Sequence, residues 1–158
     1  MVAVILPALL LQADWKTVAP SKERFSVRMP TQPQSQTREF TSGADSVQAR
    51  IYQAVSKQGV FNITVMHPMG KMTSAQLQAQ SSAFKEPFLK AMRAKETGHS
   101  KGKLGIYPGE RTTFVIDKVG KGEYWALNWK GDFYAVTAVA MSGGPGPTQT
   151  FLKSFKLK

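Results

Sequence analysis

The chain has 158 residues, of which 42% are hydrophobic, and this predicts one folded domain rather than a disordered chain. It contains no cysteine, which excludes disulfides, thiolate zinc sites and cysteine nucleophiles. Lys and Arg number 21 against 10 Asp and Glu, so the formal net charge is +11 and attracts anionic partners such as nucleic acid, phospholipid head groups or an acidic protein. Because the lysines are scattered, the charge also fits a role in solubility alone.

The first 13 residues differ in composition from the rest. Residues 2–11 carry no charge, and they are too few to span a bilayer, which takes ~20 residues. They fit the apolar core of a secretory signal with Ala13 before the cleavage point, although Pro7 and the lack of a preceding basic residue leave a buried first strand as the alternative. We therefore predict a signal peptide over residues 1–13 and a single exported domain, periplasmic or extracellular, over residues 14–158.

The first half of this domain has the pattern of strands without an intervening helix. Residues 14–23 are polar apart from Trp15 and predict an arm laid on the domain. The residues at 57–59 predict a short hairpin loop. Alternating apolar and polar side chains predict four strands, at residues 25–29, 35–41, 47–55 and 61–65.

A helix is predicted next. Thr73 or Ser74 can cap its first turn, because a hydroxyl there accepts a hydrogen bond from a free backbone N–H. Pro87 predicts a kink or break, and Gly98 predicts the end of the helical region. One face carries apolar residues at spacings of seven, four and four, which predicts core packing: Leu77, Phe84, Phe88 and Met92.

The remaining residues predict more strands and a closing helix. A short strand is predicted at 104–107, followed by three consecutive strands with turns at 120–122 and 131–132. The last strand, at 133–141, is apolar on both faces, which predicts a place at the centre of the sheet. Phe151, Leu152 and Phe155 line one side of the closing helix.

The order of strands, helix, strands and helix indicates an α+β fold with helices laid on an antiparallel sheet. The segments FSVRMPTQP at 25–33, GIYPGE at 105–110 and FLKSFKL at 151–157, with the strands and helix between them, resemble bacterial PsbP-like domains. The resemblance covers residues 24–157. It implies an α/β/α sandwich around a central antiparallel sheet, a place outside the cytoplasm (the thylakoid lumen in a photosynthetic organism), and action by binding. It supplies no catalytic motif.

Catalytic and cofactor chemistry finds little support in the residue pattern. The two histidines, His67 and His99, have no spacing that predicts a metal site with a carboxylate. There is no Gly-x-Ser-x-Gly elbow, and the glycine-rich segment at 143–147 lacks the lysine of a phosphate-binding loop. We predict no cofactor, no metal and no enzymatic activity, with a small hydrolase built on His67 or His99 as the least favoured alternative.

The densest basic stretch runs from residue 85 to residue 103, where six basic residues face only Glu86 and Glu96. A docking patch for an acidic protein or an anionic envelope surface is the functional interpretation, and a solvated helix face is the alternative. The six residues are Lys85, Lys90, Arg93, Lys95, Lys101 and Lys103.

Two further interpretations follow from apolar side chains. Trp125, Trp129 and Tyr134 stand near lysines, but their strict alternation predicts packing, so nucleic acid is not the expected partner. A carrier of a small apolar ligand, in a pocket between the middle helix and the sheet, is the main alternative to the docking function. It depends on four flexible methionines: Met66, Met69, Met72 and Met92.

Overall fold

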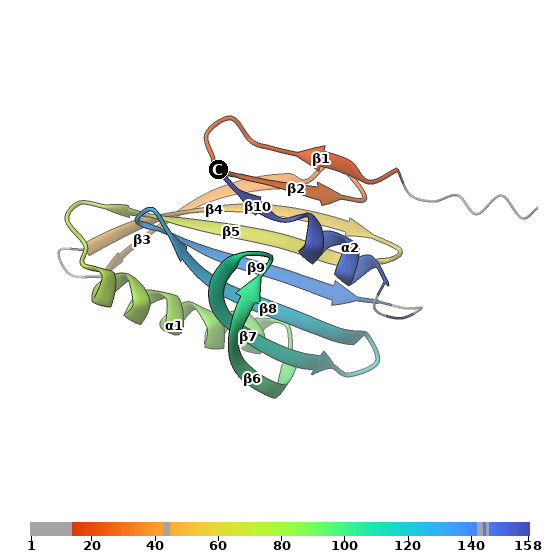
Figure 1. The fold of residues 1–158 in the computed structure, drawn as a ribbon. Coiled ribbons are helices and arrows are strands. Elements are labelled where there is room, and N and C mark those ends of the chain that lie inside the picture. The colour runs from red at the N-terminus through yellow and green to blue at the C-terminus, as the bar shows by residue number, and fades with distance from the viewer. Residues whose placement is uncertain (1–13, 43–44, 142–143, 145) are drawn as a thin grey trace, which may run out of the picture.

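A computed structural model describes residues 14–42, 45–141, 144 and 146–158. The predicted signal peptide at residues 1–13 and part of the glycine-rich segment lie outside the described residues. The described chain forms a seven-stranded and a three-stranded antiparallel sheet with two helices (Figure 1). This confirms an antiparallel sheet with helices laid on it.

The large sheet has the strand order β3-β4-β5-β9-β8-β7-β6. Its strands are β3 (Gln34–Ser42), β4 (Asp45–Ser56), β5 (Gly59–Met69), β6 (Ala94–Leu104), β7 (Tyr107–Ile116), β8 (Gly120–Trp129) and β9 (Asp132–Ala140). β9 is the fourth of the seven, and every residue from 133 to 139 is buried. The prediction that this doubly apolar strand lies at the centre is therefore confirmed.

The small sheet joins the two ends of the described chain. It contains β1 (Lys16–Val18), β2 (Phe25–Met29) and β10 (Lys156–Leu157), in the order β1-β2-β10. Lys16 pairs with Met29, so the predicted arm lies on the domain as a short strand. Trp15 packs edge-on against Phe61 of β5, with ring centroids 5.2 Å apart, and this contact fixes the arm to the large sheet.

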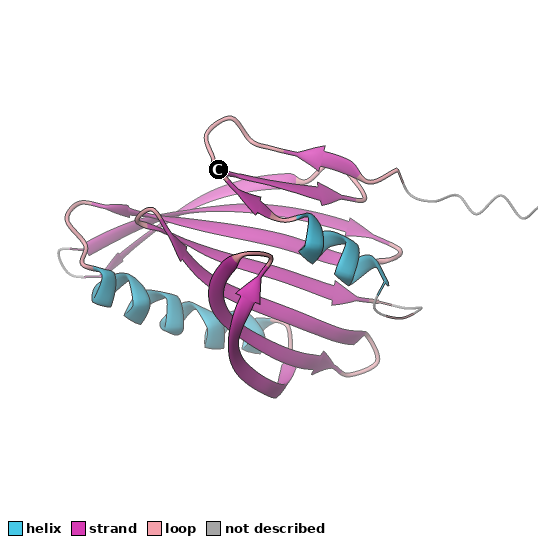
Figure 2. Ribbon diagram, in the orientation of Figure 1, coloured by secondary structure: helices cyan, strands magenta, loops and turns pink. Residues whose placement is uncertain are grey.

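The two faces of the large sheet carry different layers (Figure 2). Helix α1 (Ser74–Ala91) covers one face, where Leu77, Phe88 and Tyr124 belong to one apolar core. Helix α2 (Gly146–Ser154) and the small sheet cover the other face, where Phe25 and Phe155 belong to a second core. The layer opposite α1 is therefore partly helix and partly strand.

Helix α1 does not break at Pro87, and the prediction of a break is wrong. The helix runs on to Ala91, and Thr73 caps its start with the side chain of Gln76 in a reciprocal capping box. Phe84 and Phe88 lie on either side of Pro87 and both pack on the sheet. Burial on both sides of the proline outweighs the lost backbone hydrogen bond, which is the usual way that tertiary packing stabilises a helix.

The segment after α1 is also a correction. Residues 94–104 form strand β6, whereas the sequence predicted a helical region ending at Gly98 and a strand at 104–107. Met92 caps the helix, and the pairing of β6 with β7 shifts register between Glu96 and Gly98. Residues 95–103 are nearly all exposed, so backbone pairing rather than side-chain burial makes this edge strand.

Two turns lie beside the predicted positions. The β7–β8 turn is Asp117–Val119, with Lys118 at φ 58°. Gly122, which was predicted to be in the turn, lies inside β8, where a Cβ would overlap the ring of Phe114. The β8–β9 turn is Lys130-Gly131, one residue earlier than predicted. Both of its residues have positive φ, as a two-residue hairpin turn requires.

Candidate functional site

The structure divides the six predicted docking residues between two places. Lys85 lies within α1 and forms an ion pair with Glu96 at 3.3 Å, so its charge is largely neutralised. Lys90, in the last turn of α1, Arg93, in the turn after it, and Lys95, at the start of β6, lie close in sequence at one end of the sheet. Lys101 and Lys103 lie six and eight residues farther along β6 than Lys95, about 20 Å and 26 Å along the strand at ~3.3 Å per residue.

Two basic residues that the sequence reasoning missed join the first group. Lys95 pairs with Val115, and Val115 pairs with Lys121, so both lysines flank Val115 on one face of the sheet. Lys118 lies in the β7–β8 turn beside them. We call Arg93, Lys95, Lys118 and Lys121 the basic end; these four residues line a shallow depression of about 570 Å³.

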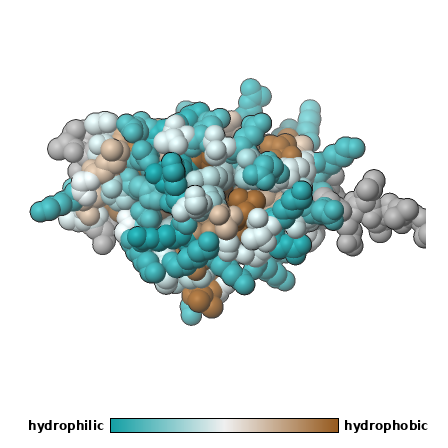
Figure 3. Space-filling view, turned by 90° about the horizontal axis from the view of Figure 1, so that it is seen from above, coloured by the Kyte–Doolittle hydropathy of each residue, from teal (hydrophilic) through white to brown (hydrophobic). Residues whose placement is uncertain are grey.

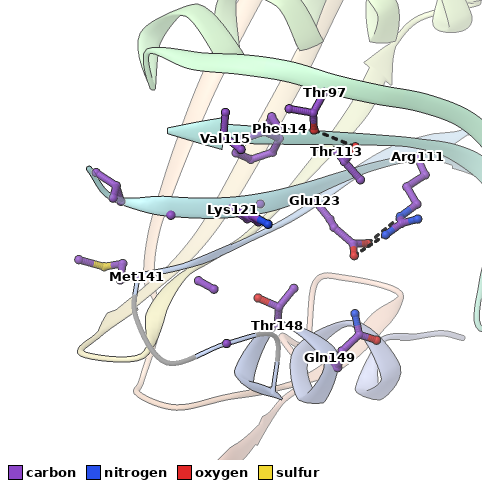
Figure 4. A pocket seen from close by; sticks show the side chains of 15 residues that line it. Thr97, Arg111, Thr113, Phe114, Val115, Lys121, Glu123, Met141, Thr148 and Gln149 are labelled. Atoms are coloured by element: carbon purple, nitrogen blue, oxygen red, sulfur yellow. Dashed lines mark hydrogen bonds and ion pairs between the residues drawn. The ribbon is translucent and has the colours of Figure 1, made fainter. Parts of the chain in front are cut away.

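The larger hollow adjoins the basic end on the α2 side of the sheet. It is an open cleft of about 780 Å³ between β7, β8 and the first turn of α2 (Figure 4). Val115, Val119 and Lys121 line both the cleft and the depression, so the two hollows are continuous. Further lining residues are Thr97, Arg111, Thr113, Glu123, Met141 and Thr148.

An ion pair fixes the inner wall of this cleft. Arg111 donates to Glu123 through Nε at 3.0 Å and Nη2 at 2.7 Å, and Trp125 Nε1 donates to the same carboxylate at 3.2 Å. The hydrogen bonds to Glu123 raise the pKa of Arg111. Three donors hold Glu123, so its negative charge is compensated inside the wall.

A smaller hollow of about 230 Å³ lies on the other face, between α1 and the sheet. Its walls are polar and include His99, Glu110 and Tyr124. The four methionines of the predicted carrier pocket are not among its lining residues, and Met66 is buried in the core. The structure therefore places the larger hollow beside α2 rather than beside the middle helix.

The two histidines lie in unrelated surroundings. His99 contacts Thr112 at 3.2 Å and Glu110 at 3.6 Å on the α1 side. His67 donates from Nδ1 to Asp132 at 2.9 Å and from Nε2 to Glu23 at 3.0 Å, and these hydrogen bonds raise its pKa to about 9. Within residues 14–42, 45–141, 144 and 146–158, no group of three His, Asp or Glu side chains could hold a metal ion.

Glu23 is the centre of a network that the sequence reasoning missed. Its side chain is fully buried, and it accepts hydrogen bonds from His67, from Tyr52 at 2.9 Å and from Arg50 at 3.2 Å. Burial alone would raise the pKa of Glu23, but these bonds outweigh it and lower the pKa. The composition of residues 14–23 predicted only a polar arm. No spacing in this segment indicates that Glu23 would contact His67, which is distant in the sequence.

The comparisons with known proteins concern the fold. No family model and no curated protein matches the chain significantly. The solution structure of cyanobacterial PsbP (CyanoP) from Synechocystis sp. PCC 6803 matches with a TM-score of 0.56 and 8% identity, over 92% of this chain and 94% of that one. A crystal structure from Bacteroides thetaiotaomicron VPI-5482 is 12% identical with a TM-score of 0.42, over 85% of this chain and 45% of that one. The PsbP-like fold predicted from the sequence is confirmed.

Proposed function

We propose that this chain is a non-enzymatic, exported PsbP-like domain that docks on a negatively charged protein or envelope surface through its basic end. The proposal includes the description of the fold as an α/β/α sandwich, which is more specific than an antiparallel sheet with two helices. One observation carries it: two segments distant in the sequence, residues 93–95 and 118–121, bring Arg93, Lys95, Lys118 and Lys121 to one shallow depression. Among the described residues, Asp117 is the only acid that lines it. Such a field accelerates association with an anionic partner and orients it.

The state of the histidines supports a binding function. Both ring nitrogens of His67 donate to carboxylates, so the ring has no free lone pair with which to accept a proton. A hydrolase built on it would need that lone pair as a general base. His99, the other candidate, lies on the opposite side of the sheet, beside Thr112.

The rest of the surface offers little apolar area for docking on the face seen from above in Figure 3. Figure 3 shows a largely hydrophilic face with small, separate hydrophobic spots. No helix in the described part of the chain is both long and apolar enough to cross a bilayer. Export remains the interpretation of residues 1–13, and N-terminal sequencing of the native protein tests it. A mature chain starting at Asp14 outside the cytoplasm supports it, and an unprocessed cytoplasmic chain contradicts it.

Charge reversal at two places tests the docking surface. A photo-crosslinking side chain at position 118 captures the partner in native extract, and binding of the identified partner is then measured against salt concentration. We expect Lys95→Glu with Lys118→Glu to weaken binding roughly tenfold or more at low salt, because like charges repel across the contact. Lys101→Glu with Lys103→Glu, the matched control with the same charge change, should weaken it less.

Three results separate the alternatives. Equal losses in both double variants would mean that only net charge matters, and would contradict a localised surface. Salt-independent binding would contradict the electrostatic basis. Binding to phosphatidylglycerol vesicles but not to phosphatidylcholine vesicles, with no protein captured, would assign the surface to the envelope membrane rather than to a protein.

A further inference from the structure

The cleft beside α2 has the apolar and the polar features of a small-molecule site. Its volume of about 780 Å³ falls within the range of ligand pockets, roughly 300–1,000 Å³. Its body lies between β7, β8 and α2, and its outer part shares Lys121 with the basic end (Figure 4).

One part of the cleft is apolar and open to solvent. Val115, Ala140 and Met141 line it together with Val119 and part of Phe114. Val119 is 38% exposed and Met141 is 42% exposed, so both are among the few large apolar side chains that the described chain leaves uncovered. An apolar group placed there would remove these side chains from water, which is the main driving force for binding in such sites.

A buried hydroxyl faces the same space without a partner. Thr148, in the first turn of α2, is only 5% exposed, and its Oγ1 has no hydrogen-bond partner. Figure 4 shows Thr148 on the α2 wall, across the cleft from Glu123. A buried polar atom left unpaired costs free energy, and a ligand oxygen in the cleft would accept the missing hydrogen bond.

The charge around the cleft is positive. Arg111 and Glu123 neutralise each other, whereas Lys121 has no ion-pair partner among the described residues. Lys95 and Lys118 of the basic end lie beyond Lys121, and they add to the positive field at the mouth. The first turn of α2 also directs the positive end of its helix dipole toward this space.

We propose that the cleft binds a small amphiphilic monoanion, an apolar body that ends in a carboxylate. The apolar body lies on Val115, Val119 and Met141. The carboxylate lies beside Lys121 and accepts a hydrogen bond from the Thr148 hydroxyl. The apolar wall disfavours a purely polar anion, and the unpaired lysine disfavours a neutral ligand, so both features together define the ligand class.

Calorimetric titration of the protein with dodecanoate, below its micellar concentration, tests the site. Dodecanol has the same apolar body without the charge, and acetate has the charge without the body. We expect saturable binding of dodecanoate at one site, binding of dodecanol weaker by roughly tenfold because the charge-assisted bond is missing, and no binding of acetate.

Three variants locate the ligand. Lys121→Met should weaken dodecanoate roughly tenfold and leave dodecanol unchanged, since the methionine keeps the side-chain length and removes the charge. Thr148→Val keeps the shape of the side chain and should weaken dodecanoate by roughly fivefold. Lys103→Met, the matched control at the other end of β6, should change neither titration.

The outcomes decide the proposal. Equal affinity for dodecanoate and dodecanol, or full affinity in both Lys121→Met and Thr148→Val, would overturn it. Acetate binding as tightly as dodecanoate would show a simple anion site and would also overturn it. The inference does not depend on the docking function, because the Lys95→Glu and Lys118→Glu variant tests partner binding while Thr148→Val tests the cleft alone.

Discussion

The α2 side of the large sheet has two halves with opposite properties. In the covered half, the small sheet and α2 bury the large rings of Phe25 and Phe155, which are 0% and 2% exposed. In the open half, around Val115 and Lys121, no helix or strand of the described chain covers this end of β7 and β8, and the cleft remains. The same face of one sheet therefore serves stability in one half and presents a hollow in the other.

The covered half is held by contacts between distant parts of the chain. The Tyr107 hydroxyl donates to the carbonyl oxygen of Leu157 and accepts from its backbone N–H, both at 3.0 Å. The His67 network ties Glu23 to β5 and to Asp132 at the start of β9. The open half is held by contacts within the neighbouring strands β6, β7 and β8, such as the Arg111–Glu123 pair and the hydrogen bond from Thr97 to Thr113. We therefore expect substitutions in the covered half to affect unfolding, and those in the open half to affect binding.

The largest effect is expected from Phe25→Ala. Its ring packs against Tyr52 and Phe155 and is fully buried, so truncation leaves a cavity and should lower the free energy of unfolding by about 4 kcal/mol. Val115→Ala in the open half should lower it by less than about 1 kcal/mol. Urea unfolding of both variants measures the contrast, and equal losses would remove the distinction between the halves.

A smaller loss is expected from His67→Gln. The substitution removes the imidazolium from Glu23, whose side chain is 0% exposed, and should lower the free energy of unfolding by about 3 kcal/mol at pH 6. His99→Gln is the control, because its side chain is 43% exposed and a loss above about 0.5 kcal/mol is not expected. A similar loss in both variants would show that histidine loss as such, not the network, is responsible.

The stabilisation by His67 should depend on pH. The folded-state pKa of about 9 lies above the ordinary 6.5, so the contribution is fully present below pH 6.5 and is lost as pH rises through about 9. The pKa of Glu23 is lowered from 4.5, so its contribution is present above pH 4.5 and is lost as pH falls through the folded-state value. The difference in unfolding free energy between wild type and His67→Gln should therefore be largest between pH 4.5 and 6.5. A difference that stays constant up to pH 10 would contradict the charged imidazolium.

A small effect on stability is expected from Thr148→Val. The hydroxyl is buried without a partner, so replacing it by a methyl group should leave the free energy of unfolding unchanged within about 1 kcal/mol, or raise it. Thermal unfolding measures this change. A large destabilisation would mean that the hydroxyl has a hydrogen-bond partner within the fold. It would contradict the role of Thr148 in the cleft.

Much of the fold could be predicted from the sequence because apolar and polar residues alternate along its strands. Residues 25–29 and 61–65 both alternate in this way and both are strands, although the second segment is buried on both faces. Strand β6 escaped prediction because its side chains are exposed on both faces, and only its pairing with β7 makes it a strand. The local pattern of apolar and polar residues does not indicate which strands pair.

The candidate site shows the same limit. The basic stretch was visible in the sequence, but the group at the sheet end needs Lys118 and Lys121, which reach Lys95 only through the register of β6, β7 and β8. Glu23 and His67 meet because the loop between β1 and β2 lies against β5, and no spacing rule relates them. Residue patterns alone could not predict these sites, because their side chains meet only when distant segments of the chain pack together.

The pairing of both chain ends with β2 has a consequence for the order of folding. Lys156 and Leu157 of β10 pair with Ser26 and Phe25 of β2, so two strands about 130 residues apart in the sequence meet in the small sheet. The small sheet cannot be completed until residues 156–157 are available to pair with β2. Contacts between such distant residues form late and slowly. The small sheet is therefore expected to form after the local hairpins of the large sheet.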